Sequence, residues 1–297
     1  MFKQRFAALT TGALIAISSL GSFAQEPSKT SPSPAPKKQE SPAVRNGIPQ
    51  SWKQVPIPQL PKFSPQEPVR FALHNGLVIF LQPNHELPLI DATMRIRGGS
   101  RAEPAEKTGM LDIYGEVWRT GGTEQRTGDQ MDDFLEARAA KLETGSNEDS
   151  TFISFSCLKG DFDPVLKMFM ELLQQPAFRD EKIALAKDQM NTSIARRNDD
   201  TDSIAGRESV KLAYGPQNPY ARVAEYATVA AVKRDDLLAW HKAHLSANNI
   251  IFGITGDFDP KQMEATLRQA FEALPKGQPV EPPKIEFTPA KPGIYLV

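Results

Sequence analysis

Cysteine and charge imbalance are what this 297-residue sequence most clearly lacks. Its single cysteine, Cys157, excludes an intrachain disulfide framework and a zinc site built from several thiolates. The 35 basic and 36 acidic residues give a net charge of −1, which argues against a polybasic nucleic-acid or membrane-surface binder. Histidine is also scarce, with four residues in the whole chain. Hydrophobic residues reach 40%, which is enough for a globular core.

Long hydrophobic runs are missing as well. The apolar stretch at residues 6–20 is interrupted by hydroxyl side chains and is short for a membrane anchor. Lys3 and Arg5 precede it, and small residues before and at Ala24 form a cleavage signal. The pattern predicts a signal peptide over residues 1–24, cut after Ala24, with no membrane span after cleavage. We therefore expect a periplasmic or secreted protein.

Proline is abundant and unevenly placed. Eleven of the 25 prolines fall between residues 25 and 68. Because proline fixes φ and removes a backbone donor, this segment is expected to be an extended linker. A compact domain should then occupy residues 69–275.

Periodicity within residues 69–275 predicts strands and helices in mixed order. Asn75-Gly76 indicates a hairpin with a type I′ turn, and Thr127 is expected to cap a helix. The pattern favours an α+β fold, an antiparallel-rich mixed sheet with helices packed on one face. The expected strands are 71–73, 77–81, 89–97, 141–146, 151–158 and 250–255, and the expected helices are 108–120, one after residue 127, 162–173, 180–198, 203–214, 235–245 and 260–274.

Short motifs follow one another in a specific order along this region. They are HNGL at 74–77, RGGSRAE at 97–103, KTGM at 107–110, GGT at 121–123, YGPQNPY at 214–220, DDL at 235–237 followed by His241 and His244, and GDFDP at 256–260. Together they resemble the amino-terminal domain of the insulinase/pitrilysin family of zinc metalloendopeptidases, which includes the mitochondrial processing peptidase. The resemblance covers residue 69 to the end of the sequence and implies the family's domain fold.

Active members of that family carry an inverted zinc motif, H-x-x-E-H, on the helix after the Thr-Gly pair. Two imidazoles bind zinc, the glutamate is the general base, and a glutamate from a downstream helix completes the coordination. Alignment through Gly109 and the GGT motif puts Asp112 and Glu116 at the histidine positions, Gly115 at the base and Ser193 at the downstream glutamate. The resemblance thus implies a degenerate motif, with no catalytic residue, no metal site and no cofactor.

Two further groups allow more than one interpretation. Asp112 and Glu116 stand four apart and could hold a hard cation, but two oxygen donors make a poor site. We expect them to be solvated or paired with a basic residue of a neighbouring helix. His241 and His244 could in principle clamp a metal, but the sequence favours capping of the last turn of their helix. The apolar pairs 117–118 and 168–169 are expected in the core.

Family enzymes hold an extended peptide along an edge strand by main-chain hydrogen bonds. The corresponding segment here is Lys141–Ser146, namely Lys141, Leu142, Glu143, Thr144, Gly145 and Ser146, with Glu-Thr where Asn-Ala is usual. Main-chain pairing tolerates side-chain changes, so peptide binding without hydrolysis is a hypothesis for this strand.

Residues 276–297 are interpreted as a linker and the start of a truncated second domain, because PAKPGIYLV resembles that domain's first strand. Active relatives build a chamber from paired halves or subunits, so the resemblance implies a homologous zinc-bearing partner. We therefore expect a non-catalytic family member that binds peptides or acts as a structural subunit. The alternatives are a divergent active zinc metalloendopeptidase whose metal site the alignment misplaces, and a truncated non-functional fragment.

Overall fold

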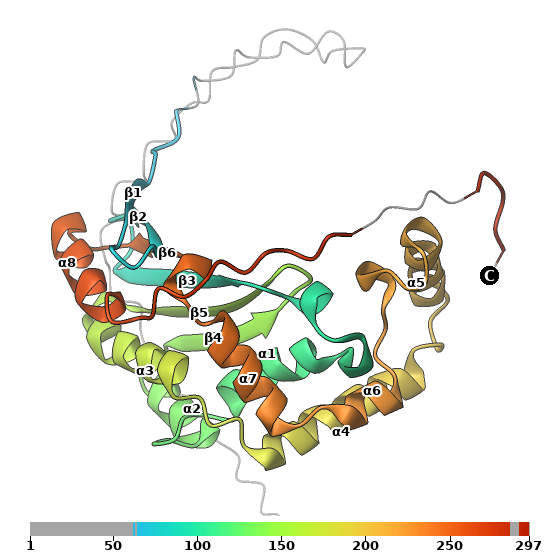
Figure 1. Ribbon diagram of the computed structural model, residues 1–297. Helices are drawn as coiled ribbons and strands as arrows, with labels where there is room; N and C mark the ends of the chain where they lie inside the picture. Colours follow the sequence, from blue (N-terminus) through green and yellow to red (C-terminus); the bar gives the residue numbers. More distant parts are fainter. Residues whose placement is uncertain (1–61, 63, 286–290, 297) are drawn as a thin grey trace, which may run out of the picture. The chain divides into compact units, whose positions relative to one another are not determined.

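The computed structural model describes residue 62, residues 64–285 and residues 291–296 (Figure 1). The strands are β1 (Val69–Ala72), β2 (Val78–Pro83), β3 (Leu89–Arg97), β4 (Lys141–Ser146), β5 (Ser150–Leu158) and β6 (Ile250–Gly256). The α-helices are α1 (Met110–Thr120), α2 (Gly128–Glu136), α3 (Phe162–Gln174), α4 (Asp180–Arg196), α5 (Thr201–Tyr214), α6 (Tyr226–Ala231), α7 (Arg234–His244) and α8 (Pro260–Phe271).

The strands form one sheet in the order β1-β2-β6-β3-β5-β4. The β2–β6 pair is parallel and the other neighbours are antiparallel. Along β3, every second residue from Ile90 to Ile96 is buried and the residues between them are exposed. Since successive side chains of a strand point to opposite faces, one face of the sheet carries the core and the other faces outward. The predicted fold class is confirmed.

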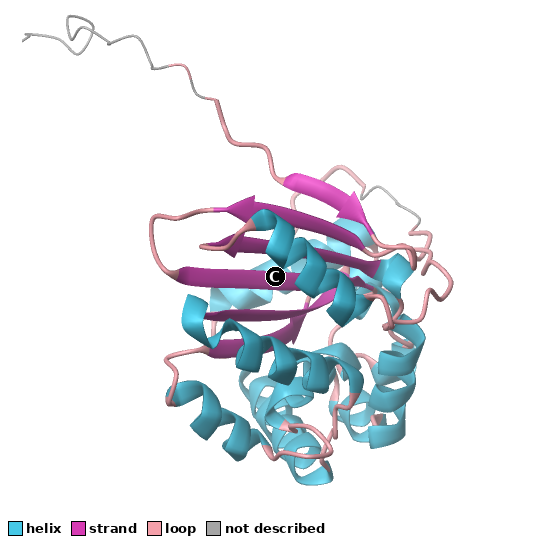
Figure 2. Cartoon of the chain, turned by 90° about the vertical axis from the view of Figure 1, so that its left-hand side faces the viewer, coloured by secondary structure: helices cyan, strands magenta, loops and turns pink. Residues whose placement is uncertain are grey.

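Helices pack against the sheet (Figure 2), and aromatic side chains join the two layers. The ring of Phe169 on α3 lies 6.1 Å from that of Phe252 on β6 and 6.4 Å from that of Phe271 on α8. All three are fully buried, as is Trp118 on α1. Rings at these separations favour edge-to-face contact, which these two pairs adopt. The pairs 117–118 and 168–169 lie in this core, as predicted.

The hairpin between β1 and β2 forms where expected, but its turn is not type I′. The Gly76 N–H donates to the Leu73 carbonyl at 3.0 Å, and only Gly76 in this turn has a positive φ, 97°. A type I′ turn needs positive φ at both central residues. This turn is therefore type I followed by a left-handed glycine. Asn75 keeps negative φ while its side-chain amide donates to carbonyls at the end of α8.

The remaining sequence predictions concern helix caps, a helix that was not predicted, and the two ends of the chain. Thr127 caps α2 within a complete capping box, as predicted. The short helix α6 has no counterpart among the predicted elements. The signal peptide and most of the proline-rich segment lie outside the described residues. Residues 291–296 form no strand, and Ile294 is 94% exposed. In the described part of the chain, none of the helices has the length and apolar character needed to cross a membrane.

Candidate functional site

Helix α1 carries three of the four motif positions, and its start is fixed by a distant side chain. Gly109 precedes the helix with φ 98° and offers no side-chain cap. Instead the two carboxylate oxygens of Glu103 accept the N–H of Gly109 at 2.9 Å and that of Leu111 at 3.0 Å. A carboxylate at a helix N-terminus satisfies free donors and complements the helix dipole. Glu103 thereby sets where α1 begins.

Glu103 is 4% exposed. Burial raises its pKa to about 7, although the two backbone N–H bonds lower it in part. A folded pKa above the usual value means that this group favours the folded state most at acidic pH and less as pH rises toward 7.

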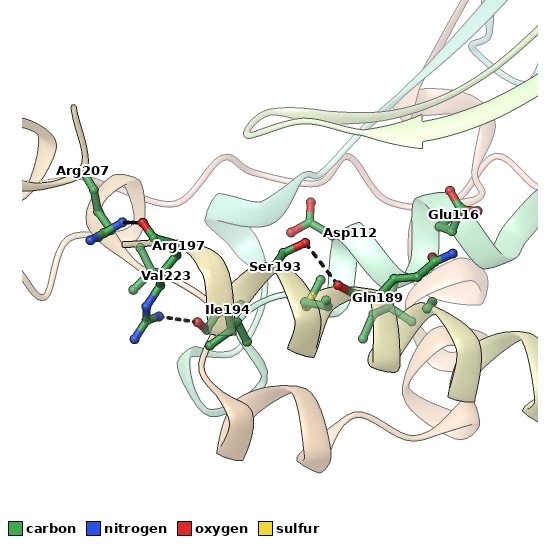
Figure 3. A pocket seen from close by; sticks show the side chains of 12 residues that line it. Asp112, Glu116, Gln189, Ser193, Ile194, Arg197, Arg207 and Val223 are labelled. Carbon is green, nitrogen blue, oxygen red and sulfur yellow. Dashed lines mark hydrogen bonds between the residues drawn. The ribbon is translucent and has the colours of Figure 1, made fainter. Parts of the chain in front are cut away.

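A cleft of about 490 Å³ lies between α1 and α4, and the segment before α6 also lines it. Asp112 and Glu116 enter it from α1, and Ser193 enters it from α4 (Figure 3). The structure thus brings three of the four motif positions to one cavity. The full lining is Asp112, Ile113, Glu116, Ala186, Gln189, Met190, Ser193, Ile194, Arg197, Arg207, Val223 and Ala224.

Gly115 occupies the position aligned with the general base, and it faces β4 at very close range. A Cβ built on Gly115 would lie 2.9 Å from Cα and C of Gly145 and from N of Ser146. Real Cβ atoms essentially never approach backbone so closely. At this position the helix therefore has room for glycine alone unless β4 moves.

Thr144 ties β4 to the same turn of α1. Its hydroxyl donates to the Gly115 carbonyl at 2.6 Å and accepts the Arg119 N–H at 3.1 Å. In a regular α-helix the Arg119 N–H would donate directly to the Gly115 carbonyl, four residues earlier. The threonine hydroxyl bridges these two backbone groups. The side chain of Ser146 adds a bond to the Leu111 carbonyl at 2.8 Å.

The side chains in the cleft differ from the ligands that zinc prefers in peptidases. Asp112 and Glu116 offer carboxylate oxygens in place of imidazoles, and the Ser193 hydroxyl donates to the Gln189 carbonyl of its own helix at 3.1 Å. Among the residues that the structure describes, no three histidine, cysteine, aspartate or glutamate side chains are grouped to hold a metal. The donor set does not fit the family's zinc ion.

Asp112 reaches solvent, yet its environment still affects its ionisation. Partial burial in the cleft raises its pKa, and the nearby Glu148 carboxylate raises it further. Neither the Asp112 nor the Glu116 carboxylate has a hydrogen bond or ion pair with another described residue. Of the two expectations for this pair, solvation holds and pairing with a basic residue does not.

His241 does not cap its own helix, contrary to the prediction. It is 6% exposed, and its Nε2–H donates to the Leu173 carbonyl at 2.8 Å, in the last turn of α3. Its Nδ1 therefore accepts the Tyr114 hydroxyl proton, also at 2.8 Å. Burial lowers the pKa of His241 to about 4, so the ring is neutral at pH 7. His244 does bond the last turn of α7, through the Trp240 carbonyl.

Strand β4 lies at one edge of the sheet, next to β5 alone. The Asn147 N–H donates to the Ser150 carbonyl at 2.9 Å. In an antiparallel pair only every second residue bonds to the neighbouring strand, so the residues of β4 that bond to β5 are those at even spacing from Asn147. The N–H and C=O groups of Leu142, Thr144 and Ser146 consequently point to the free edge. Arg119 Nε donates to the Leu142 carbonyl at 2.8 Å, and the other five groups have no hydrogen bond within the described residues.

Family models match most of this region. One, described as Insulinase (Peptidase family M16), matches residues 79–215, and another, described as Peptidase M16 inactive domain, matches residues 231–295. The chain belongs to peptidase family M16, the insulinase family. The first match contains α1, β4 and α4, and therefore all residues that line the cleft except Val223 and Ala224.

Proteins of similar sequence are described as zinc proteases and as a processing peptidase subunit. An uncharacterized zinc protease of Rickettsia felis is 22% identical over 224 residues, covering 74% of this chain and 52% of that protein. A probable mitochondrial-processing peptidase subunit beta of Arabidopsis thaliana is 21% identical, covering 68% of this chain and 38% of its own length. The M16 chain thus spans about half the length of the Rickettsia relative.

Solved structures with the same fold include a peptidase domain and a periplasmic protease. A peptidase M16 inactive domain from Pseudomonas fluorescens superposes with a TM-score of 0.69 at 24% identity, covering 76% of this chain and 55% of that chain. The periplasmic protease PqqL from Escherichia coli gives a TM-score of 0.65 at 19% identity, covering 77% and 26%. At these identities the likeness establishes the fold and nothing finer.

Some residues of the site could not be found from sequence motifs. Glu103 lies within a quoted motif, but its capping role depends on a loop that returns it to Gly109. A helix that begins after glycine, without its own cap, is the signal that could have suggested it. Glu148, Arg207 and Val223 reach the cleft region only through tertiary folding, and no local pattern identifies them.

Proposed function

We propose that this M16 chain is a non-catalytic domain that binds an extended peptide along β4 and works beside a zinc-bearing M16 subunit. The observation that carries the proposal is the contact between Gly115 and β4. A Cβ at 115 would meet the strand backbone at 2.9 Å, so the position aligned with the general base has no room for a carboxylate. The cleft has no general base and carries carboxylates where the family motif has imidazoles. It therefore lacks the groups that would bind zinc and activate a water molecule.

The free edge of β4 supports peptide binding. Five main-chain groups of Leu142, Thr144 and Ser146 point away from β5 without a hydrogen bond inside the described chain. An extended peptide can satisfy such groups by adding a strand, and this mode depends little on the side chains of the host strand. Exposed strand edges also invite partners in general, because unpaired donors and acceptors are costly when dehydrated. The bonds from Thr144 and Ser146 to α1 hold this edge in place.

Export to the periplasm and a partner subunit are the remaining parts of the proposal. The predicted signal peptide supports the first. The second is supported by the coverage of about half of the Rickettsia relative and by the match to a domain described as inactive. A partner would supply the metal and base that this chain's motif positions lack.

Zinc analysis tests the non-catalytic part. The purified chain is incubated with zinc, dialysed and analysed for metal, with an H-x-x-E-H-bearing M16 protein as the positive control. We expect far less than one zinc per chain and no hydrolysis of a mixture of unstructured peptides. Stoichiometric zinc together with hydrolysis would overturn this part of the proposal.

Backbone methylation tests the peptide-binding part. Extended peptides that bind the full chain are resynthesised with N-methyl groups on alternate residues, in two complementary patterns. We expect one pattern to abolish binding and the other to leave it intact, because only alternate amides face a neighbouring strand. Equal loss from both patterns would argue against strand addition.

Co-purification with an H-x-x-E-H-bearing M16 protein from native extract tests the proposed partner subunit.

A further inference from the structure

The cleft beside β4 is mostly apolar and open on one side. Its walls come from Ile113 on α1, Met190 and Ile194 on α4, and Val223 and Ala224 before α6. With a volume of about 490 Å³, it is large enough for a long side chain. The aliphatic part of such a side chain would contact these walls.

The charged groups at the cleft are of two kinds. Both arginines are already engaged and lie beside a carboxylate. Arg197 donates to Glu225, and Arg207 donates to the Arg197 carbonyl and lies 3.8 Å from a Glu208 carboxylate oxygen. Asp112 and Glu116, in contrast, have no partner among the described residues. The unbalanced charge of the cleft is therefore negative, and Glu148 beside Asp112 adds to it.

The two carboxylates stand next to the free edge of β4. Gly115 lies between them on α1 and contacts the strand backbone at Gly145 and Ser146. Residues four apart on a helix project from one face, with Cβ atoms about 5–6 Å apart. Asp112 and Glu116 therefore project from one side of α1, beside the contact of Gly115 with β4, and Figure 3 shows both projecting into the cleft.

Few ligands match an apolar wall with two unpaired carboxylates. A purely apolar side chain would leave both charges without a counterion in a dehydrated cleft, which is costly. A lone divalent cation would find two carboxylates and too few further oxygens. Lysine and arginine combine an aliphatic stem with a cationic head, so they meet both requirements.

We propose that the cleft between α1 and α4 binds a lysine or arginine side chain of a peptide extended along β4, with Asp112 and Glu116 holding its cationic head. The inference rests on the proposed function, because the peptide backbone must lie on the β4 edge. It adds what that function leaves open, namely the kind of peptide. Basic residues at one register would be preferred over neutral or acidic residues.

A peptide series with one basic residue tests the inference. Nonapeptides of alternating threonine and valine, with free ends blocked, carry a single lysine at each position in turn. Matched series carry norleucine or glutamate at the same positions. Affinity for the full chain is measured by fluorescence anisotropy at low and high salt. We expect lysine at one position to bind at least about tenfold tighter than norleucine, with the advantage shrinking as salt rises.

Matched variants locate the effect. Asp112→Asn with Glu116→Gln removes the two cleft carboxylates and should abolish the preference for lysine. Asp188→Asn with Glu124→Gln changes the charge equally at two exposed positions outside the cleft and should keep the preference. Thermal unfolding of each variant shows that the fold is retained.

The outcomes separate the two proposals. Equal binding of the lysine and norleucine series would overturn the basic-residue site while leaving strand addition intact. A preference that persists in the Asp112→Asn, Glu116→Gln variant would place the selectivity elsewhere and also overturn it. If no peptide of any series binds, strand addition on β4 fails and the side-chain site fails with it.

Discussion

At the scale of single residues, Gly115 leaves no room for a side chain between α1 and β4. Replacing it by alanine places a Cβ against the backbone of β4. Overpacking of this kind costs about 1–3 kcal/mol, whereas replacing a helical glycine by alanine gains about 1 kcal/mol of propensity. We therefore expect Gly115→Ala to lower the free energy of unfolding in urea denaturation.

Gly206 on α5 provides the matched control. It also lies in a helix, but a Cβ added there meets no atom within 4 Å. Gly206→Ala should be neutral or stabilising by up to about 1 kcal/mol. If both alanine variants stabilise the chain equally, the close packing of α1 on β4 is wrong.

His241 gives the chain a pH dependence at the residue scale. Its pKa falls from 6.5 to about 4 on folding because the ring is buried. Between these values the unfolded chain binds a proton that the folded chain does not, so this contribution to stability is complete above pH 6.5 and is lost as pH falls toward 4. Its full size is on the order of 3 kcal/mol.

The measurement compares the wild type with His241→Gln, which cannot titrate. We expect the difference in their free energies of unfolding to shift against the wild type as pH falls through this range. Glu103 acts in the opposite direction, but it is present in both proteins and cancels in the difference. A difference that stays constant with pH would contradict the neutral buried ring.

At the scale of elements, the link between β4 and α1 depends on one hydroxyl. Thr144→Val keeps the side-chain shape but removes the bonds to the Gly115 carbonyl and the Arg119 N–H. Losing partners for such buried groups costs about 1–3 kcal/mol. We expect this loss in stability, together with faster hydrogen exchange of the Arg119 amide.

Thr144→Ser retains the hydroxyl and should restore most of the stability and the protection of that amide. Serine and valine variants that behave alike would show that packing of the methyl group, rather than the hydrogen bonds, joins the two elements.

Sequence periodicity located most elements because their alternation is strong. The ends of β3 and β4 match the predicted residues. β3 alternates between the core and the outside over most of its length, whereas the last three residues of β4 are all half-buried. The short helix α6 was missed because it spans six residues and has a single buried one, Val229. The type of the Asn75-Gly76 turn and the partners of His241 depend on α8 and α3, which are distant in sequence, so local patterns could not reveal them.

The residues of the candidate site could be predicted from the sequence, but their surroundings could not. Motif alignment singled out Asp112, Glu116 and Ser193, and these line one cleft. Their chemistry, however, depends on what surrounds them. The distance from Gly115 to β4 and the engagement of Arg197 and Arg207 by other residues are tertiary facts without a local signature.

At the scale of the whole molecule, stability should be uneven. None of the residues of α5 is buried, whereas α3, of similar length, has seven buried residues. Helices without apolar burial open locally at little cost. We expect amides of α5 to exchange with solvent about a hundredfold or more faster than those of α3 in native-state hydrogen exchange. Equal protection would mean that α5 is held by contacts beyond those described.

The contact of Gly115 with β4 also bears on how the family's zinc motif could be introduced into this chain. Histidine at 112 or 116, or glutamate at 193, would place a ligand of that motif on a cavity wall with free volume. A glutamate at 115 could not be accepted until the strand had withdrawn, and that withdrawal would first break the Thr144 link. A chain with the strand withdrawn would be less stable. An engineer who wished to build the family's zinc motif on α1 would therefore have to redesign β4 before the helix.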